Sequence, residues 1–222
     1  GKRNAFNLGG CGMKITILCS SQNHPIYPCL VHWIDNNKEH SISLKNSVKE
    51  VESGDILFLI SCSEIVKKEV RDKFRATLVV HASDLPKGRG WSPYIWKVIE
   101  GANKIPVTLL EAEDKVDSGK IWNQLFYELE GHELYDEMNQ KLFDCTFKLM
   151  NYAIDNIETI QPKLQRNEEP SYYRKRNPED SKIDINKSIE EQFNLLRVAD
   201  PNRYPSFFEH KGHKYKIMLE KM

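Results

Sequence analysis

His81 and Asp117 are the residues best placed for acid–base chemistry, each in a predicted loop. His81 directly follows residues 76–80, a β-branched apolar run that predicts a buried strand, and a loop rich in Pro and Gly begins there. Asp117 lies in the loop after a second apolar run, residues 105–111. Because ligands of open α/β sheets bind beyond the carboxyl ends of the strands, we expect the two side chains to form a pair there. Such a pair can move a proton and stabilise negative charge.

Strands and helices alternate ahead of these residues. Residues 14–19 and 55–61 predict strands, and the second is a continuous apolar run typical of a strand buried on both faces of a parallel sheet. A polar loop at residues 20–24 and a helix over residues 25–36 follow the first strand. This order predicts an α/β fold with a mostly parallel, Rossmann-like sheet. The loop has neither G-x-G-x-x-G nor a P-loop lysine, so neither nucleotide-binding fingerprint is present.

Two further helices are predicted from apolar periodicity. Residues 64–74 predict a charged amphipathic helix with Ile65, Val66 and Val70 facing inward. Residues 133–159 predict a long helix whose apolar stripe belongs to the core.

The loop after His81 is expected to turn sharply at Pro86, Gly88 and Gly90, which also let the backbone approach a ligand closely. Pro93 is placed as in the first turn of a helix, and Trp91 is expected to pack rather than to stack on a ligand.

The composition changes at residue 161. Residues 161–184 are rich in charge and proline, which predicts a linker or a segment draped over the first domain. Ser188 and Glu191 have the capping-box spacing and predict the start of a helix. Two runs, residues 207–210 and 213–219, flank a Lys-Gly pair and predict a β-hairpin. A small C-terminal helix and a hairpin are therefore expected after the main domain.

Charge and cysteine content limit the class of protein. The 222 residues contain 32 Lys and Arg against 32 Asp and Glu, so bulk binding of nucleic acid is not expected. Five cysteines without C-x-x-C or zinc-type spacing predict buried free thiols and no metal site. No apolar run approaches the roughly 20 residues that span a bilayer. We expect a soluble cytoplasmic protein without a membrane partner, in which residues 1–12 are an extension or an expression remnant.

An extended motif begins at the histidine. The order His-x-Ser-x-Leu-Pro-x-x-x-Gly is carried by His81, Ser83, Leu85, Pro86 and Gly90. An apolar strand and then Asp-Ser-Gly at residues 117–119 complete the motif. This pattern strongly resembles the formyltransferases that use N10-formyltetrahydrofolate. The match fixes several residue types over roughly forty positions, which is far more specific than a short motif.

The C-terminal part is similar to the nucleotide-sugar N-formyltransferase branch of these enzymes. Arg174 and residues 177–181, 193–197 and 204–208 carry this similarity. The resemblance implies a catalytic formyltransferase domain over residues 13–160. It also implies that residues 161–222 bind a nucleotide-linked amino sugar and contribute to a homodimer.

The resemblance also implies roles for individual residues. His81 and Asp117 are the implied catalytic residues. The residues implied at the folate cofactor are Ile65, Val66, Val70, Leu85, Glu113, Asp114 and Val116. Those implied at the nucleotide-linked sugar are Tyr172, Tyr173, Arg174, Arg197 and Tyr204. Guanidinium forks and aromatic faces suit a diphosphate and a base. From periodicity alone, Ile65, Val66 and Val70 would belong to the hydrophobic core. Both interpretations of these three residues, core packing and cofactor contact, stay open.

One position departs from the family pattern. The family usually has Asn two residues before the histidine, and this chain has Val79, which cannot donate a hydrogen bond. Loss of one oxyanion donor costs roughly 10²–10³-fold in turnover. A folate- or nucleotide-binding module without catalysis is therefore one alternative.

A glycinamide ribonucleotide type transformylase is a second alternative, although residues 20–24 lack its Gly/Ser-rich phosphate loop. The loop sequence after His81 most resembles enzymes of pseudaminic acid pathways. The resemblance thus favours a UDP-linked 4-amino-4,6-dideoxy-AltNAc as the acceptor. A tRNA acceptor is disfavoured by the neutral charge and the short C-terminal tail.

Overall fold

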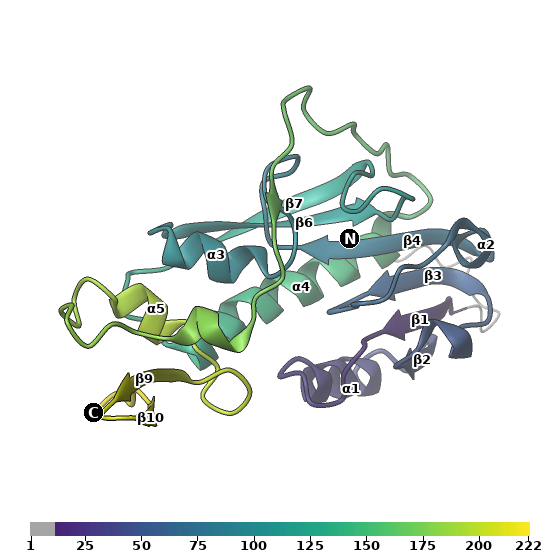
Figure 1. Ribbon diagram of the computed structural model, residues 1–222. Coiled ribbons are helices and arrows are strands. Elements are labelled where there is room, and N and C mark those ends of the chain that lie inside the picture. Colours follow the sequence, from purple (N-terminus) through teal and green to yellow (C-terminus); the bar gives the residue numbers. More distant parts are fainter. Residues whose placement is uncertain (1–11) are drawn as a thin grey trace. The chain divides into compact units, whose positions relative to one another are not determined.

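The computed structural model describes residues 12–222 and contains a six-stranded sheet in the order β2-β1-β3-β4-β6-β7 (Figure 1). Its strands are β1 (Lys14–Leu18), β2 (Ser41–Lys45), β3 (Gly54–Leu59), β4 (Phe74–His81), β6 (Lys104–Glu111) and β7 (Ile121–Glu128). β2, β1, β3 and β4 pair in parallel. The predicted α/β fold with a mostly parallel sheet is confirmed. Apart from Gly12, the predicted extension at residues 1–12 lies outside the described residues.

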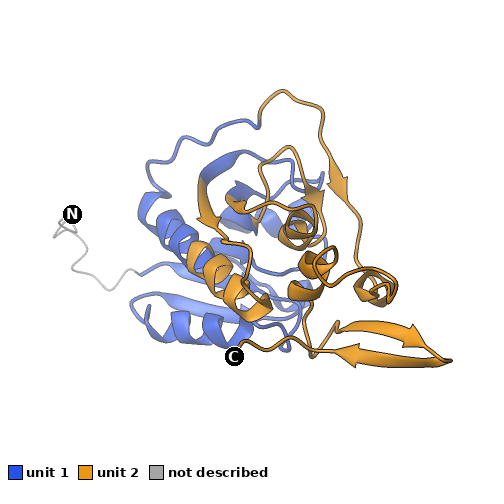
Figure 2. Ribbon diagram, turned by 90° about the vertical axis from the view of Figure 1, so that its left-hand side faces the viewer, with its two compact units in different colours: residues 1–80, 109–123, 146–165 blue, residues 81–108, 124–145, 166–222 orange. Residues whose placement is uncertain are grey.

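The chain divides into two compact units (Figure 2). Unit 1 contains residues 109–123 and 146–165 and the described residues up to 80, and unit 2 contains residues 81–108, 124–145 and 166–222. Strands β4, β6 and β7 and the long helix α4 (Tyr135–Asn156) have residues in both units. His81 belongs to unit 2, whereas Asp117 belongs to unit 1.

Unit 1 is built around β1, whose apolar side chains are fully buried because strands lie on both of its sides. Helix α1 (Tyr27–Asp35) confirms the helix predicted over residues 25–36, and it has a proline in its first turn. Its Trp33 donates from the indole nitrogen to Asn151 Oδ1 at 3.0 Å and stacks on Phe147 at 6.4 Å between ring centroids. Packing of a helix against another helix thus completes this core.

The helix predicted over residues 64–74 is wrong in extent. Only α2 (Lys68–Arg71) is helical, and the residue before it has extended backbone angles. Ile65 is 80% exposed, contrary to the inward position that periodicity predicted, while Val66 is buried among strand residues. Arg71 donates from NH1 to the backbone oxygen of Val66 at 2.8 Å. A side-chain bond thus holds residues 64–67 outside the helix, which local periodicity does not reveal.

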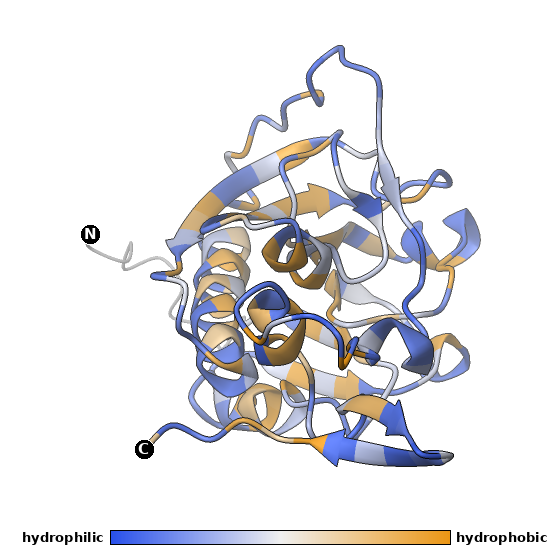
Figure 3. Cartoon of the chain, turned by 60° about the vertical axis from the view of Figure 1, so that its left-hand side comes forward, coloured by the Kyte–Doolittle hydropathy of each residue, from blue (hydrophilic) through white to orange (hydrophobic). Residues whose placement is uncertain are grey.

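Unit 2 contains residues 166–184 of the polar segment that was predicted over residues 161–184, and most of that connection is hydrophilic (Figure 3). Its β8 (Tyr172–Tyr173) pairs in parallel with β5 (Arg89–Gly90). Ser171 binds the loop after His81 three times, through Pro86 O, Gly88 N and Arg89 N. Of the two predicted alternatives, a linker and a segment draped over folded structure, the contacts of Ser171 support the draped segment.

Two predicted helices and two short turns are also present. Helix α3 (Pro93–Ile99) starts at the proline predicted for its first turn, and α4 (Tyr135–Asn156) confirms the long predicted helix. Short 3-10 turns lie at η1 (Val48–Glu50) in unit 1 and η2 (Pro178–Ser181) in unit 2.

Helix α5 (Phe193–Arg197) begins later than the capping-box pattern predicted. Ser188 Oγ does accept from the Glu191 backbone nitrogen at 3.1 Å, but Ile189 is 69% exposed instead of facing the core. The pattern therefore caps a turn rather than the helix.

The C-terminal hairpin is confirmed as β9 (Ser206–His210) and β10 (His213–Ile217). Lys211 and Gly212 both have positive φ, 49° and 78°, as a type I′ turn requires. Within residues 12–222, no helix has the length and apolar character needed to cross a membrane.

The predicted burial of the cysteines is confirmed for Cys19, whereas Cys29 and Cys62 are only half-buried. Cys19, Cys29 and Cys62 form no disulfide, and burial raises the pKa of the Cys19 and Cys62 thiols. Across the described part of the chain, no cluster of His, Cys, Asp and Glu could hold a metal ion.

Candidate active site

His81 is the last residue of β4 and is 8% exposed. Its Nε2 lies 2.7 Å from the backbone oxygen of Gly88. A carbonyl oxygen only accepts hydrogen bonds, so this contact assigns a proton to Nε2. The loop after β4 therefore fixes both the tautomer and the orientation of the ring.

Two glycines allow this loop to close on itself. Gly88 has a φ of +73°, and a Cβ there would lie 2.9 Å from Ser83 Cβ. Gly90 has a φ of +99°, and a Cβ there would lie 2.4 Å from the backbone oxygen of Tyr173. Both the left-handed backbone and the close approach exclude a side chain. The sharp turns predicted at these glycines are confirmed.

Asp117 lies in the loop after β6, in unit 1, with a φ of +52°. Gln165 Nε2 donates to the backbone oxygens of Asp117 and Gly119, at 2.7 and 3.0 Å. A Cβ on Gly119 would lie 1.8 Å from Glu111 O, so the Asp-Ser-Gly motif ends in an obligatory glycine. Because His81 and Asp117 belong to different units, their pairing stays a prediction.

Arg71 joins the two segments of unit 1 that were predicted to bind the cofactor. Its guanidinium donates to Val66 O at 2.8 Å and to Asp114 Oδ1 at 2.7 Å. Ile65 and Val116, one from each segment, expose 80% and 54% of their apolar side chains. Exposed apolar side chains beside polar backbone suit a flat heterocycle.

The other predicted cofactor residues differ in exposure. Val66 is buried and Val70 is half-buried against the same core cluster as Phe74, which supports the core interpretation of their periodicity. Leu85 is fully buried in unit 2. Glu113 and Asp114 are exposed.

Three of the residues predicted to bind the sugar nucleotide, Tyr172, Tyr173 and Arg174, lie on or directly after strand β8 of the β5–β8 ladder. Arg89 donates from NH1 to the hydroxyl of Tyr172 at 3.2 Å, and Tyr172 is 51% exposed. Tyr173 stacks on Trp96 at 6.1 Å between centroids. Burial, followed by the neighbouring Glu100 carboxylate, raises the pKa of Tyr173 to about 12, so this hydroxyl is a donor.

Arg174 is held by Asp180 rather than pointing freely into solvent. Its two terminal nitrogens donate to the two carboxylate oxygens at 2.8 and 2.5 Å, and its guanidinium carbon lies 4.9 Å from the centroid of the Trp96 ring. The Arg174 guanidinium, above all, lowers the pKa of Asp180 to about 2. A phosphate that binds Arg174 would therefore compete with this carboxylate.

Arg197 does not have the position that its predicted role requires. The residue is 2% exposed, and its guanidinium binds Glu133 O at 3.2 Å and Asn194 Oδ1 at 2.9 Å. Burial of so large a cation requires fixed partners. We therefore correct this assignment: Arg197 is a structural residue of unit 2. Tyr204 remains half-exposed, with the Arg203 guanidinium carbon 5.8 Å from its ring centroid.

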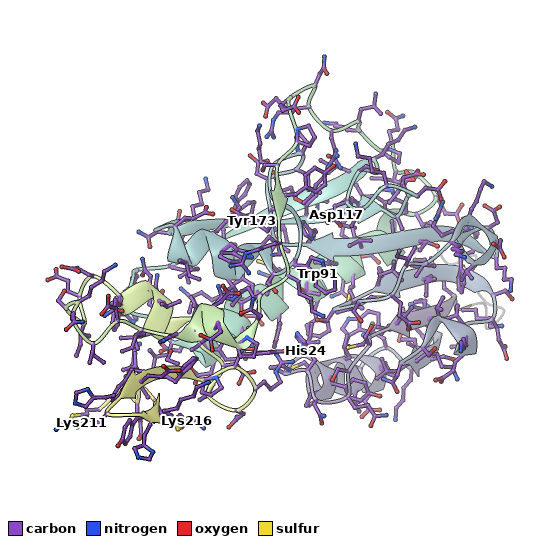
Figure 4. All side chains as sticks on the ribbon, in the orientation of Figure 1. His24, Trp91, Asp117, Tyr173, Lys211 and Lys216 are labelled. Carbon is purple, nitrogen blue, oxygen red and sulfur yellow. The ribbon has the colours of Figure 1, made fainter. Side chains whose placement is uncertain are left out.

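Trp91 was missed as a site residue, because the sequence analysis treated it as packing. It is 41% exposed, and Lys175 Nζ lies 5.0 Å from its ring centroid. Its backbone nitrogen donates to Tyr173 O at 3.1 Å, so the two residues labelled in Figure 4 are neighbours. The run of aromatic and basic residues at 172–176 was the sequence signal for such a surface.

The fold is a Rossmann-like α/β fold, and the loops of His81 and Asp117 carry the motif that resembles formyltransferases. The family model described as formyl transferase matches residues 14–154, so the chain belongs to the formyl transferase family. A methionyl-tRNA formyltransferase of Francisella philomiragia is 30% identical over 166 residues, which are 73% of this chain and 52% of that protein. The chain spans about half the length of the curated relatives it matches.

Solved structures with similar folds include two of particular interest. HypX from Aquifex aeolicus in complex with tetrahydrofolic acid has a TM-score of 0.77 at 18% identity, over 94% of this chain and 38% of that one. A 4-N formyltransferase from Francisella tularensis has a TM-score of 0.69 at 19% identity, over 95% of this chain and 99% of that one. The formyl transferase family uses N10-formyltetrahydrofolate, which confirms the predicted cofactor.

Proposed function

We propose that the chain is a sugar N-formyltransferase, which moves the formyl group of N10-formyltetrahydrofolate to the amine of a nucleotide-linked amino sugar. The observation that carries this proposal is the surface formed by Trp91, Tyr172 and residues 173–176. It combines exposed aromatic rings with basic side chains in the unit that contains His81. Aromatic faces and cations are what a nucleoside diphosphate requires.

The fold likeness to the 4-N formyltransferase, which extends over nearly all of both chains, supports the same choice. A UDP-linked 4-amino-4,6-dideoxy-AltNAc, the acceptor of pseudaminic acid pathways, is the first substrate to test. We also propose a cytoplasmic location and a homodimer through residues 161–222, as implied by the family resemblance. The extension at residues 1–12 and the domain boundary at residue 160 are part of the same proposal.

His81 and Asp117 have the catalytic roles in this proposal. The sugar amine attacks the formyl carbon, a C–N bond forms, and negative charge develops on the formyl oxygen. His81 donates a hydrogen bond to that oxygen, and Asp117 favours the charged form of the imidazole. The amine loses its proton through Asp117, the bond to the folate nitrogen breaks, and that nitrogen takes up the proton.

The cofactor is proposed to lie along the segments that Arg71 joins, with Ile65, Val116 and the backbone near Glu113 and Asp114 against its ring. Val66, Val70 and Leu85 would support this surface from beneath, since they are half-buried or buried. Tyr172, Tyr173, Arg174, Tyr204 and Trp91 are the residues proposed at the nucleotide.

Release of tetrahydrofolate tests the proposal. The acceptors are UDP- and dTDP-linked 4-amino sugars, glycinamide ribonucleotide and methionyl-tRNA, with His81→Ala and Asp117→Ala as controls. Turnover with a nucleotide sugar that falls about 10²–10⁴-fold in both variants supports the proposal. Turnover only with methionyl-tRNA or glycinamide ribonucleotide refutes the acceptor. Nucleotide binding without turnover on any acceptor would identify a binding module, with Val79 as the reason.

A further inference from the structure

A continuous chain of hydrogen bonds ends on the loop that follows His81. Arg166 donates from NH1 to Asp84 Oδ1 at 2.9 Å. Gln124 Nε2 donates to the same carboxylate oxygen at 3.2 Å and to Thr108 Oγ1 at 3.0 Å. The Thr108 hydroxyl then donates to the backbone oxygen of Ser83 at 2.8 Å. Each donor in this chain has one acceptor per proton, so the direction of every bond is determined.

Ser83 connects this chain of bonds to the histidine. Its backbone nitrogen donates to His81 O at 3.0 Å, so the residue is bound at both its N–H and its C=O. Ser83 also contacts Gly88, since a Cβ added there would lie 2.9 Å from Ser83 Cβ. Gly88 is the residue whose carbonyl holds the imidazole. A shift of Ser83 would therefore move the acceptor that orients the ring.

Thr108 and Ser83 are fully buried, so water cannot replace a lost bond at low cost. Thr108 lies on β6, the apolar strand of the family motif, and Gln124 lies on β7, outside that motif. Regular strands hold side chains more rigidly than loops do. The sheet thus supplies a fixed support for a loop without helix or strand between residues 82 and 88.

We propose that Thr108 and Gln124 are positioning residues of the formyl transfer, which set the orientation and the tautomer of the His81 imidazole through Ser83. Neither residue touches the reacting atoms. This inference rests on the proposed catalytic role of His81. It adds to the machinery two residues that were not among the predicted site residues.

The test compares Thr108→Val with Thr108→Ser. Valine keeps the shape but loses the hydroxyl, whereas serine keeps the donor. NMR of protein labelled with 15N at histidine reports the tautomer of each imidazole ring and needs no sugar substrate. The signals of the His81 ring are assigned because they are missing from the spectrum of His81→Ala. We expect an Nε2–H tautomer in the wild type and in Thr108→Ser, and a mixture in Thr108→Val. The kcat of Thr108→Val should fall about tenfold at nearly constant KM, as expected for a sub-ångström displacement.

Thr77→Val is the matched control, because Thr77 is also buried but its Oγ1 has no hydrogen-bond partner among the described residues. It removes the same atoms and should leave turnover and the His81 tautomer unchanged. If Thr108→Val fails to fold, Gln124→Met removes the donor to Thr108 and makes the same two predictions. A wild-type tautomer and kcat in the folded variant would overturn the inference, as would equal losses in Thr77→Val. An active His81→Ala would instead overturn the catalytic role of His81, which the tautomer measurement does not assume.

Discussion

Arg197 offers a sharp test of the difference between a buried structural cation and a phosphate ligand. The side chains of Arg197 and Glu133 are only 1% and 3% exposed. Arg197→Met keeps an apolar side chain of similar length but removes the cation that binds Glu133. Loss of one partner from a buried ion pair costs about 3–5 kcal/mol, and the lower end applies here because Lys141 and backbone N–H groups still bind the Glu133 carboxylate. At about 2–4 °C per kcal/mol for a chain of this size, Tm should fall by roughly 10 °C. Thermal unfolding followed by circular dichroism measures this change.

Arg174→Met is the matched control, because Arg174 is largely exposed on the proposed nucleotide surface. Its Tm should change little, whereas its affinity for UDP, measured by calorimetry, should fall. Arg197→Met should have a lower Tm but an unchanged affinity for UDP, measured at a temperature below its thermal unfolding. The reasoning is refuted if Arg197→Met keeps the wild-type Tm and loses UDP binding, since Arg197 would then be a ligand.

Three further outcomes are expected. Gly90→Ala should destabilise the protein more than Gly101→Ala in urea unfolding, because both have positive φ but only the Gly90 Cβ meets a backbone oxygen. Burial raises the pKa of Glu133, but N–H donors outweigh it and lower that pKa from 4.5 to about 2. This carboxylate therefore contributes about 3 kcal/mol above pH 4.5 that is lost as pH falls toward 2, and Glu133→Gln should flatten the acid limb of a stability–pH curve. Trp91→Ala should weaken UDP binding about tenfold by calorimetry, and an unchanged affinity would remove Trp91 from the nucleotide surface.

The sheet was predictable because each strand is an apolar run whose burial does not depend on distant partners. β1, β3 and β4 lie within one or two residues of the predicted ranges, and His81 ends its strand as expected. The glycines after His81 were also predictable, since only glycine suits both the positive φ and the close backbone approach.

Predictions failed where a side-chain contact that the local pattern does not encode determines the position of a residue. Ile65 was expected inside a helix, but a bond from Arg71 holds the preceding residues in an extended path. Arg197 looked like a phosphate ligand, because its partner Glu133 lies 64 residues away in the sequence. Trp91 was assigned to packing, since no local pattern separates an exposed aromatic from a buried one.

The parallel pairing of β5 with β8 also has a consequence for the order of folding. Arg89 and its partner Tyr172 are separated by 83 residues, and the helix α4 lies between them. Closing so long a loop has an entropic cost that only the contacts made after closure offset, so this ladder should form late. During synthesis, the amides of Gly88 and Arg89 gain their partners only after Ser171 has left the ribosome. The loop that orients His81 is therefore completed among the last steps of folding, and a chain that stops before residue 171 should hold a sheet but no ordered catalytic loop.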